Sequence, residues 1–188
     1  MSELHALLGA AGVPVSYVLV AHSLGGLFAR LYASTWPEEV AGLVLVDAWP
    51  ESLPELLGPD QWAAYEELAE PAPPGLESYR DLEMVDFGAA SERMRQAAAV
   101  TPLRDVPLFV LSRARPVALP PDVPASFSPP AFEQAWRRGQ DELAALLPGA
   151  RHAIASNSDH YIQVEQPDLV IDAVRAVVEA LRDPASWP

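Results

Sequence analysis

Four short apolar runs, separated by helical stretches, limit the fold of this chain more than any other sequence feature. The first, residues 15–21 (VSYVLVA), is almost continuously apolar and rich in β-branched residues, and residues 40–46 (VAGLVLV) repeat this character. Such runs are typical of strands that are buried on both faces, as in a parallel sheet. Two further strands are expected over residues 106–111 and 151–156. Strands that alternate with helices predict an α/β fold with about four parallel strands and flanking helices.

Helical periodicity fills the segments between the strands. A short helix over residues 3–11 is expected to end at Gly12, and Pro14 blocks its continuation. A Pro-rich stretch over residues 113–130 is too long to be a plain connection. The remaining helices are expected over residues 24–36, 60–70, 91–100, 131–147 and 167–182.

Residues 49–101 differ in character from the rest of the chain. They contain short amphipathic helices on either side of a Pro-rich break at residues 71–75 (PAPPG). We expect this segment to lie outside the sheet as a helical lid or cap insertion. The core domain would then consist of residues 1–48 and 102–188.

The charge balance and the missing residue types exclude several kinds of chemistry. The net charge is −14, so the chain lacks the cationic surface that nucleic acids and anionic membranes require. Cysteine and lysine are absent, which removes thiol nucleophiles, thiolate metal sites and Schiff-base chemistry. No apolar run reaches the roughly 18 residues of a membrane span, and no signal-peptide pattern opens the chain. We therefore expect a cytoplasmic protein.

Ser23 stands between the first predicted strand and a helix, within residues 21–26 (AHSLGG). A serine on such a sharp strand–turn–helix junction has its hydroxyl lifted above the sheet, as a nucleophile requires. The turn needs small residues two positions before and after the serine, and Ala21 and Gly25 meet that need. The helix start provides N–H groups, and the N–H of Leu24 can point at a developing oxyanion. The alternative is an ordinary serine N-cap.

Two segments resemble the α/β-hydrolase superfamily. Residues 17–48 (YVLVAHSLGGLFARLYASTWPEEVAGLVLVDA) are similar to its nucleophile-elbow region, with Ala21 in place of the usual first glycine of G-x-S-x-G. Residues 156–178 (SNSDHYIQVEQPDLVIDAVRAVV) are similar to its catalytic-histidine loop and final helix. The resemblance implies that Ser23 is the nucleophile and His160 the general base. His160 as an ordinary loop histidine is the alternative.

The acid of the triad has three candidates. Most of the family carries it after the strand that corresponds to residues 106–111, where this sequence has no carboxylate. Asp47, at the end of the second strand, matches the position that dehalogenase-like members use, and we favour it over Asp122 and Asp159. A turn-capping role is the alternative for Asp47.

The other histidines and the tryptophans are weaker candidates. His22 is expected to pack at the elbow, where it could support the backbone of Ser23, and His5 and His152 to be packing or surface residues. His152 and His160 have no carboxylate pair beside them, so no metal site is expected. Acyl-enzyme chemistry on a serine implies no organic cofactor either. Trp49 and Trp62 could line an acyl pocket, although core packing is the default for tryptophan.

Together these features predict an esterase-type serine hydrolase that acts on a small ester-like molecule through an acyl-enzyme. Thioesterase, amidase, perhydrolase and lactonase chemistry would use the same triad. The family places further strands, and a loop with a second oxyanion donor, before the elbow, where this sequence has only a helix; we therefore expect a truncated chain. The alternative function is thus a weak or inactive remnant that acts, if at all, as an interaction module. An exposed first strand also predicts a homodimer through the sheet edge.

Overall fold

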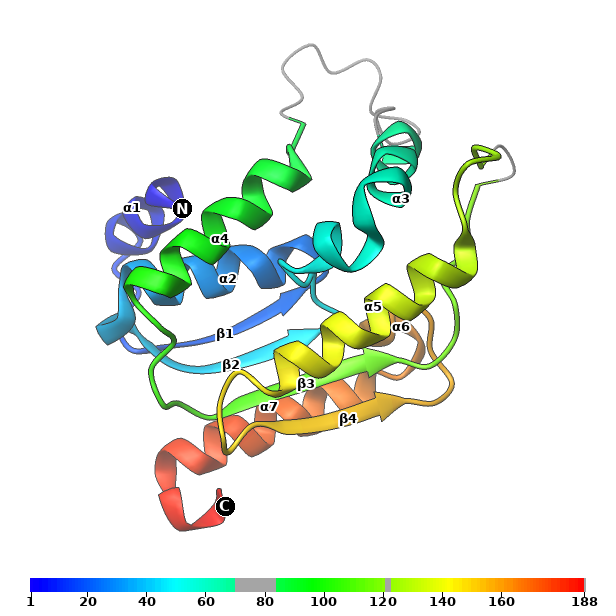
Figure 1. Ribbon diagram of the computed structural model, residues 1–188. Coiled ribbons are helices and arrows are strands. Elements are labelled where there is room, and N and C mark those ends of the chain that lie inside the picture. Colours follow the sequence, from blue (N-terminus) through cyan, green and yellow to red (C-terminus); the bar gives the residue numbers. More distant parts are fainter. Residues whose placement is uncertain (70–83, 121–122, 188) are drawn as a thin grey trace.

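The computed structural model describes residues 1–69, 84–120 and 123–187, and its described part is built on one parallel sheet (Figure 1). The strands lie in chain order, β1-β2-β3-β4, and each pairs in parallel with the next. This arrangement confirms the predicted α/β class and matches a partial α/β-hydrolase fold. The strands are β1 (Tyr17–His22), β2 (Val40–Val46), β3 (Leu108–Arg113) and β4 (Arg151–Ala155).

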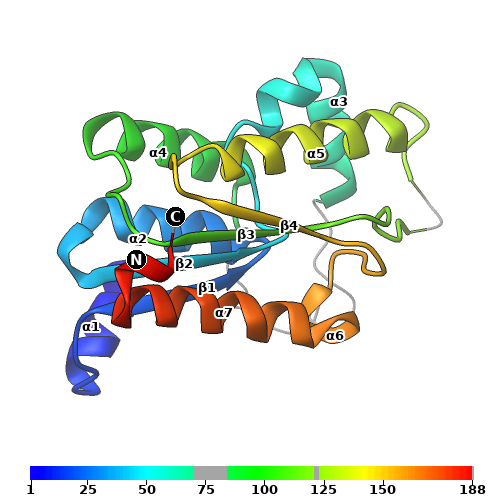
Figure 2. The ribbon, with the colours of Figure 1, turned by 90° about the horizontal axis from the view of Figure 1, so that it is seen from below.

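Helices cover both faces of the sheet (Figure 2). On one face, Leu43 and Leu45 of β2 pack in a buried cluster with residues of α2 (Leu24–Thr35) and α5 (Pro129–Ala144). On the other face, Val44 and Val46 of the same strand pack against α7 (Pro167–Arg182). Alternate residues of β2 therefore enter opposite cores, which is why the strand is apolar throughout rather than at every second position.

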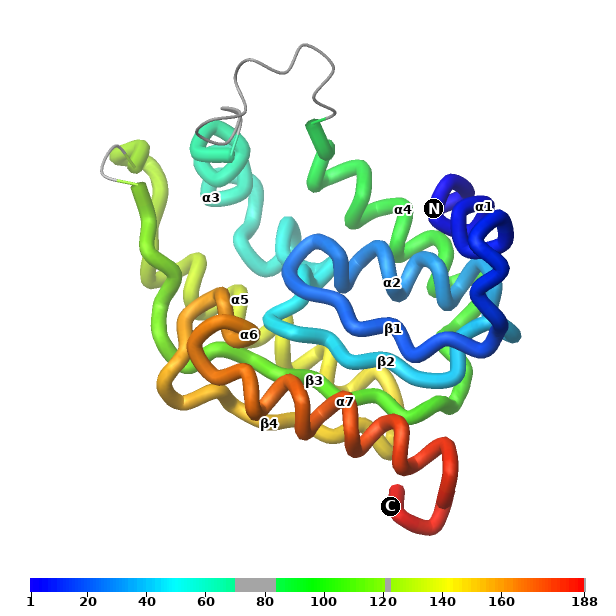
Figure 3. Tube along the Cα trace, turned by 180° about the vertical axis from the view of Figure 1, so that it is seen from behind, coloured from blue at the N-terminus to red at the C-terminus, as the bar shows by residue number. Residues whose placement is uncertain are grey.

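The segment between β2 and β3 adds helices above the sheet and no strand within the described residues. It contains α3 (Leu53–Ala69) and α4 (Phe87–Val100), with α4 beside α2 and α3 beside α5 (Figures 1 and 3). The proposed boundaries of an insertion at residues 49–101 stay a prediction. None of the helices in the described ranges combines the length and the apolar character needed to cross a bilayer.

Several predicted boundaries were wrong for identifiable reasons. β3 begins at Leu108 rather than at residue 106, because Pro107 precedes the strand and contributes only its carbonyl, which accepts from the N–H of Leu43 at 2.9 Å. α3 begins at Leu53, seven residues before the predicted start, and bends at Gly58, whose φ is +73°. The predicted helix over 91–100 begins at Phe87, since Asp86 caps it.

The other described elements either have the predicted bounds or differ from them by short segments. β2 and α7 have the predicted bounds. A one-turn helix, α6 (Ile162–Glu165), was not predicted, and α1 (Ser2–Ala10) ends one residue early. Two 3-10 turns, Pro37–Glu39 and Pro184–Ser186, complete the described elements.

Candidate active site

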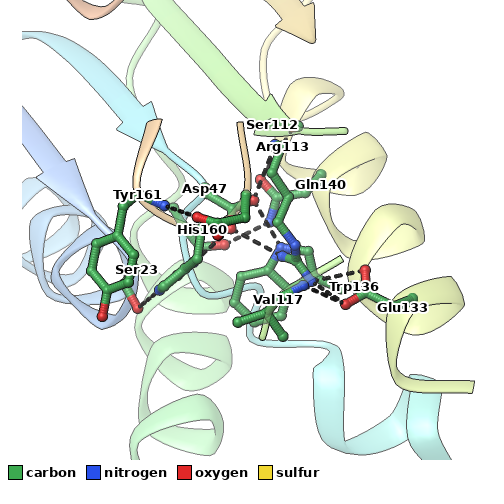
Figure 4. A network of polar contacts seen from close by, with 12 residues as sticks. Ser23, Asp47, Ser112, Arg113, Val117, Glu133, Trp136, Gln140, His160 and Tyr161 are labelled. Atoms are coloured by element: carbon green, nitrogen blue, oxygen red, sulfur yellow. Dashed lines mark hydrogen bonds and ion pairs between the residues drawn. The ribbon is translucent and has the colours of Figure 1, made fainter. Parts of the chain in front are cut away.

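The carboxyl ends of β1, β2 and β4 bring three predicted site residues into one hydrogen-bonded chain (Figure 4). Ser23 follows β1, Asp47 follows β2, and His160 lies in the loop after β4. The Oγ of Ser23 lies 2.9 Å from Nε2 of His160, and Nδ1 of His160 lies 2.6 Å from Oδ2 of Asp47. This is the order in which a nucleophile, a base and an orienting carboxylate must be connected.

The backbone holds Ser23 in an unusual conformation. Its φ of 55° and ψ of −131° lie outside the regions that L-residues ordinarily adopt, so the turn is strained. The strain is held by two hydrogen bonds to β2 and its extension, from the N–H of Ser23 to the carbonyl of Val46 (3.1 Å) and from the N–H of Trp49 to the carbonyl of Ser23 (2.8 Å). Leu24 is the first residue of α2, so its N–H has no acceptor within the helix and is available near the Ser23 hydroxyl.

Two glycines at the start of α2 have different steric roles. A methyl group on Gly25 would lie 4.0 Å from Cβ of Ala21, which is ordinary contact. A methyl group on Gly26 would lie 2.3 Å from Cβ of Ala48, closer than real side chains approach. Gly26 is thus the residue on which the close contact between α2 and the end of β2 depends. The G-x-S-x-G pattern contains Gly25 and not Gly26, so the motif does not predict this role.

Asp47 is fully buried and surrounded by hydrogen-bond donors. Its Oδ2 accepts from His160 and from the Arg113 guanidinium (3.0 Å), and its Oδ1 accepts from Nε1 of Trp136 (2.9 Å) and the N–H of Arg113 (3.3 Å). Burial alone raises the pKa of Asp47. The hydrogen bonds from His160 and Trp136 and the positive charge of Arg113 outweigh burial and hold that pKa below its ordinary value. Asp47 therefore stays ionised at neutral pH.

The backbone at Asp47 also fixes the direction of its side chain. Its φ is +41°, and its N–H donates to the carbonyl of Leu111 at 2.7 Å. The sequence did not predict that Arg113 and Trp136 complete the surroundings of this carboxylate. Trp136 belongs to the apolar face of α5, and an arginine at a strand end carries no signal of its partner.

His22 contacts the histidine loop rather than the backbone of Ser23. Its Nε2 donates to the main-chain carbonyl of His160 at 2.7 Å, and the two rings lie 4.4 Å apart. Burial lowers the pKa of His22, and the hydrogen bond to His160 only partly offsets that effect. A neutral His22 therefore ties the end of β1 to the loop that carries His160.

The other candidates lie apart from this chain of hydrogen bonds. Asp122 falls outside the described residues. The carboxylate of Asp159 accepts from the N–H of Tyr161 at 3.1 Å, a local turn contact. His152 pairs with the buried Ser112 at 2.8 Å, and His5 stacks on Trp36.

An apolar pocket of about 330 Å³ opens beside Ser23 and His160. Trp49 lines it, as the sequence suggested, whereas Trp62 packs behind it against Tyr65. The pocket is lined mainly by aromatic and aliphatic side chains from α3, α4, α5 and the Pro-rich loop: Trp49, Tyr65, Leu68, Phe87, Val117, Leu119, Phe127, Phe132 and Trp136. Across residues 1–69, 84–120 and 123–187, no three histidine or carboxylate side chains gather as metal ligands would.

Comparison with known proteins identifies the family. The family model described as alpha/beta hydrolase fold matches residues 10–141, well over half of the chain, and the chain therefore belongs to this family. This confirms the resemblance on which the site was predicted. The matched range contains Ser23 and Asp47, while His160 lies beyond it.

Solved structures show the same fold at low sequence identity. A putative lipase from Acinetobacter baumannii is 20% identical with a TM-score of 0.60, over 97% of this chain and 67% of the lipase. A probable hydrolytic enzyme from Pseudomonas aeruginosa is 20% identical with a TM-score of 0.57, over 93% of this chain. A thermophilic esterase from Thermogutta terrifontis is 19% identical with a TM-score of 0.51, over 95% of this chain and 69% of the esterase. The chain spans 66% of the length of the Pseudomonas protein, and no curated protein matches it in sequence.

Proposed function

We propose that the chain is a serine hydrolase that cleaves carboxylic esters through an acyl-enzyme on Ser23. The observation that carries this proposal is the continuous hydrogen-bonded chain Ser23–His160–Asp47 at one end of the sheet. Membership of the alpha/beta hydrolase fold family supports a hydrolytic function. The strained turn at Ser23 adds support, because such strain is found where a side chain must be presented to a substrate.

Each residue has a defined role in this reaction. Oγ of Ser23 attacks the carbonyl carbon of the ester while Nε2 of His160 takes the hydroxyl proton. Asp47 orients the imidazole and stabilises the imidazolium that forms. The N–H of Leu24 donates to the oxyanion of the tetrahedral intermediate. His160 then gives its proton to the leaving alcohol, and water repeats the sequence on the acyl group.

The pocket supports an apolar acyl group as the preferred substrate part. Its walls are aromatic and aliphatic, and the charged group among them, Arg113, is already paired with Asp47 and Glu133. A volume of about 330 Å³ lies at the lower end of the range of small-molecule sites, which favours short or medium acyl chains. The similar structures include a putative lipase and a thermophilic esterase, names that denote ester hydrolysis.

Fluorophosphonate labelling, read by intact mass, tests the proposal. We expect one adduct on the parent chain and none on Ser23→Ala. Ser112→Ala is the matched control. Ser112 also lies 2.8 Å from a histidine Nε2, that of His152, but it is only 4% exposed, and no carboxylate of the described residues is hydrogen-bonded to that histidine. Its labelling should equal that of the parent.

The second candidate function, a weak or inactive remnant, has its own expected result. A folded chain that takes no adduct and hydrolyses no short-chain nitrophenyl ester would refute the hydrolase proposal. One observation favours this candidate: the chain spans 66% of the length of the Pseudomonas protein and 67% of the length of the Acinetobacter lipase.

Self-association through β1 remains a separate prediction. β1 is the outermost strand of the described sheet, and Val20 within it is 48% exposed. Unpaired strand edges with apolar side chains favour pairing with a second copy. Sedimentation at micromolar concentration should detect a dimer, and a monomer there would contradict the prediction.

A further inference from the structure

The carboxylate of Asp47 is shared between the imidazole of His160 and a buried cation. The guanidinium NH1 of Arg113 lies 3.0 Å from Oδ2 of Asp47, the same oxygen that accepts from His160. The Arg113 side chain is only 3% exposed. Charges this well shielded from water interact more strongly with neighbouring charges than charges on the surface do.

Arg113 carries a second carboxylate on its other nitrogen. NH2 of Arg113 donates to both carboxylate oxygens of Glu133, at 2.9 and 3.0 Å, and the Glu133 side chain is 13% exposed. The site therefore contains two negative charges and one positive charge, arranged in the order Asp47–Arg113–Glu133 (Figure 4). The net charge that faces His160 is that of one carboxylate.

We propose that Arg113 and Glu133 are positioning residues that hold Asp47 in place. Together with Asp47 they set the net charge that faces the imidazole of His160 when it takes up a proton. This proposal rests on the proposed function only in treating the proton that His160 takes up as the one that Ser23 loses. The arrangement of charges does not depend on that function. Arg113 alone would cancel the charge of Asp47 and oppose a protonated imidazole. Glu133 cancels the charge of Arg113 and leaves that of Asp47 to act on His160.

Helix α5 links this arrangement to the substrate pocket. Glu133 and Trp136 lie three residues apart on α5, so both project toward the end of β3. Trp136 donates to Asp47, and its ring lies 4.8 Å from the Arg113 guanidinium. Oε1 of Glu133 also accepts from the N–H of Val117, which lines the pocket, at 3.2 Å. One helix therefore fixes both the orienting carboxylate and a wall of the pocket.

The other titratable groups around His160 come from several elements. His22 and Tyr161 have their rings 4.4 and 5.4 Å from the His160 ring. Tyr65 of α3 lies in the pocket wall, and Asp159 precedes His160 in the loop. The Arg115–Glu165 ion pair lies on the surface beside the loop. Among the titratable groups of the described residues, Arg113 and, through it, Glu133 are connected by hydrogen bonds to Asp47, which accepts from Nδ1 of His160.

Charge-removing variants test the proposal through shifts of opposite sign. NMR titration of the imidazoles, with His160 assigned from His160→Gln among the chain's four histidines, follows the proton without requiring turnover. We expect Glu133→Gln to move the His160 midpoint down by on the order of half a pH unit, because a negative charge is lost. Arg113→Gln should move it up by a similar amount, and the double variant should return near the parent.

Control variants distinguish charge from packing. Glu142→Gln removes the same charge from the same helix, where Glu142 accepts from Ser52, and should leave the midpoint in place. Arg113→Lys keeps the positive charge but cannot bond to Asp47 and Glu133 at the same time through a planar guanidinium. It should lower kcat without moving the titration midpoint of His160. If Arg113→Gln does not fold, the sign of the Glu133→Gln shift decides alone.

The outcomes separate this proposal from the proposed function. Midpoints that do not move in Glu133→Gln, or move upward, would overturn the proposal. Opposite shifts in a chain that takes no fluorophosphonate adduct would uphold the charge arrangement and reject the esterase. In an active enzyme the acid limb of kcat/KM should follow the same shifts.

Discussion

Replacing Gly26 with alanine should destabilise the protein because α2 meets the end of β2 at this residue. The new methyl group would lie 2.3 Å from Cβ of Ala48, about 1 Å short of ordinary contact. Ala48 cannot easily move, since it is fully buried and its carbonyl accepts from Gln140 at 2.7 Å. Overpacking costs about 1–3 kcal/mol, and alanine regains up to about 1 kcal/mol over glycine in a helix. We expect a net loss of about 1–2 kcal/mol, which lowers Tm by about 2–8 °C in a chain of this size.

Gly25→Ala is the matched control for this prediction. It makes the same change one residue earlier in the same helix, where the nearest atom would be Cβ of Ala21 at 4.0 Å. Thermal unfolding by circular dichroism should give a Tm equal to or slightly above that of the parent. Because Ala48 follows Asp47, Gly26→Ala should also reduce hydrolysis more than the lost stability explains. Equal Tm values for the two variants would refute the steric reasoning.

Three further predictions concern the site and the pocket. Trp136→Phe keeps the ring but removes the N–H donor to Asp47, so kcat/KM for a nitrophenyl ester should fall roughly 10-fold with little change in the folded circular dichroism spectrum. Burial lowers the pKa of His22, so His22 contributes stability above pH 6.5 that is lost as the pH falls below that value. Tm should therefore drop less on acidification in His22→Gln than in the parent, and parallel curves of Tm against pH would contradict this. Phe132→Leu widens the pocket, and the ratio of kcat/KM for octanoate over acetate esters should rise roughly 10-fold; an unchanged ratio would place the acyl group elsewhere.

Much of the fold could be predicted because local and tertiary preferences agree. The bounds of β2 and α7 follow from an unbroken apolar run and from a regular helical stripe that begins at Pro167. The bounds of β3 could not be predicted as well, because Val106 and Pro107 are apolar neighbours of the strand but do not pair within it. The start of α3 was not predicted, because the backbone is not helical at Gly58 (φ +73°, ψ 168°) and the helical residues before that kink form a separate short segment.

The candidate site was predictable where it depends on strand ends. Ser23 and Asp47 each stand directly after a strand, β1 and β2, and parallel strands bring such positions to one edge of the sheet. The partners of Asp47 were not predictable in the same way. Arg113 of β3 and Trp136 of α5 contact Asp47, and Glu133 of α5 contacts Arg113. These contacts depend on the placement of α5 over β3, which nothing in the residues near each of them encodes.

The order of the strands also determines when the proposed site is completed during synthesis. Each strand pairs with the one that precedes it in the chain, so a sheet that forms in the order of synthesis would bring Ser23 and Asp47 together before β3 and β4 are made. His160 follows Asp47 by 113 residues and Ser23 by 137, so it joins them only after the last strand has docked. A partly made chain would then hold a serine without its base, and reactivity toward fluorophosphonate would report completed folding.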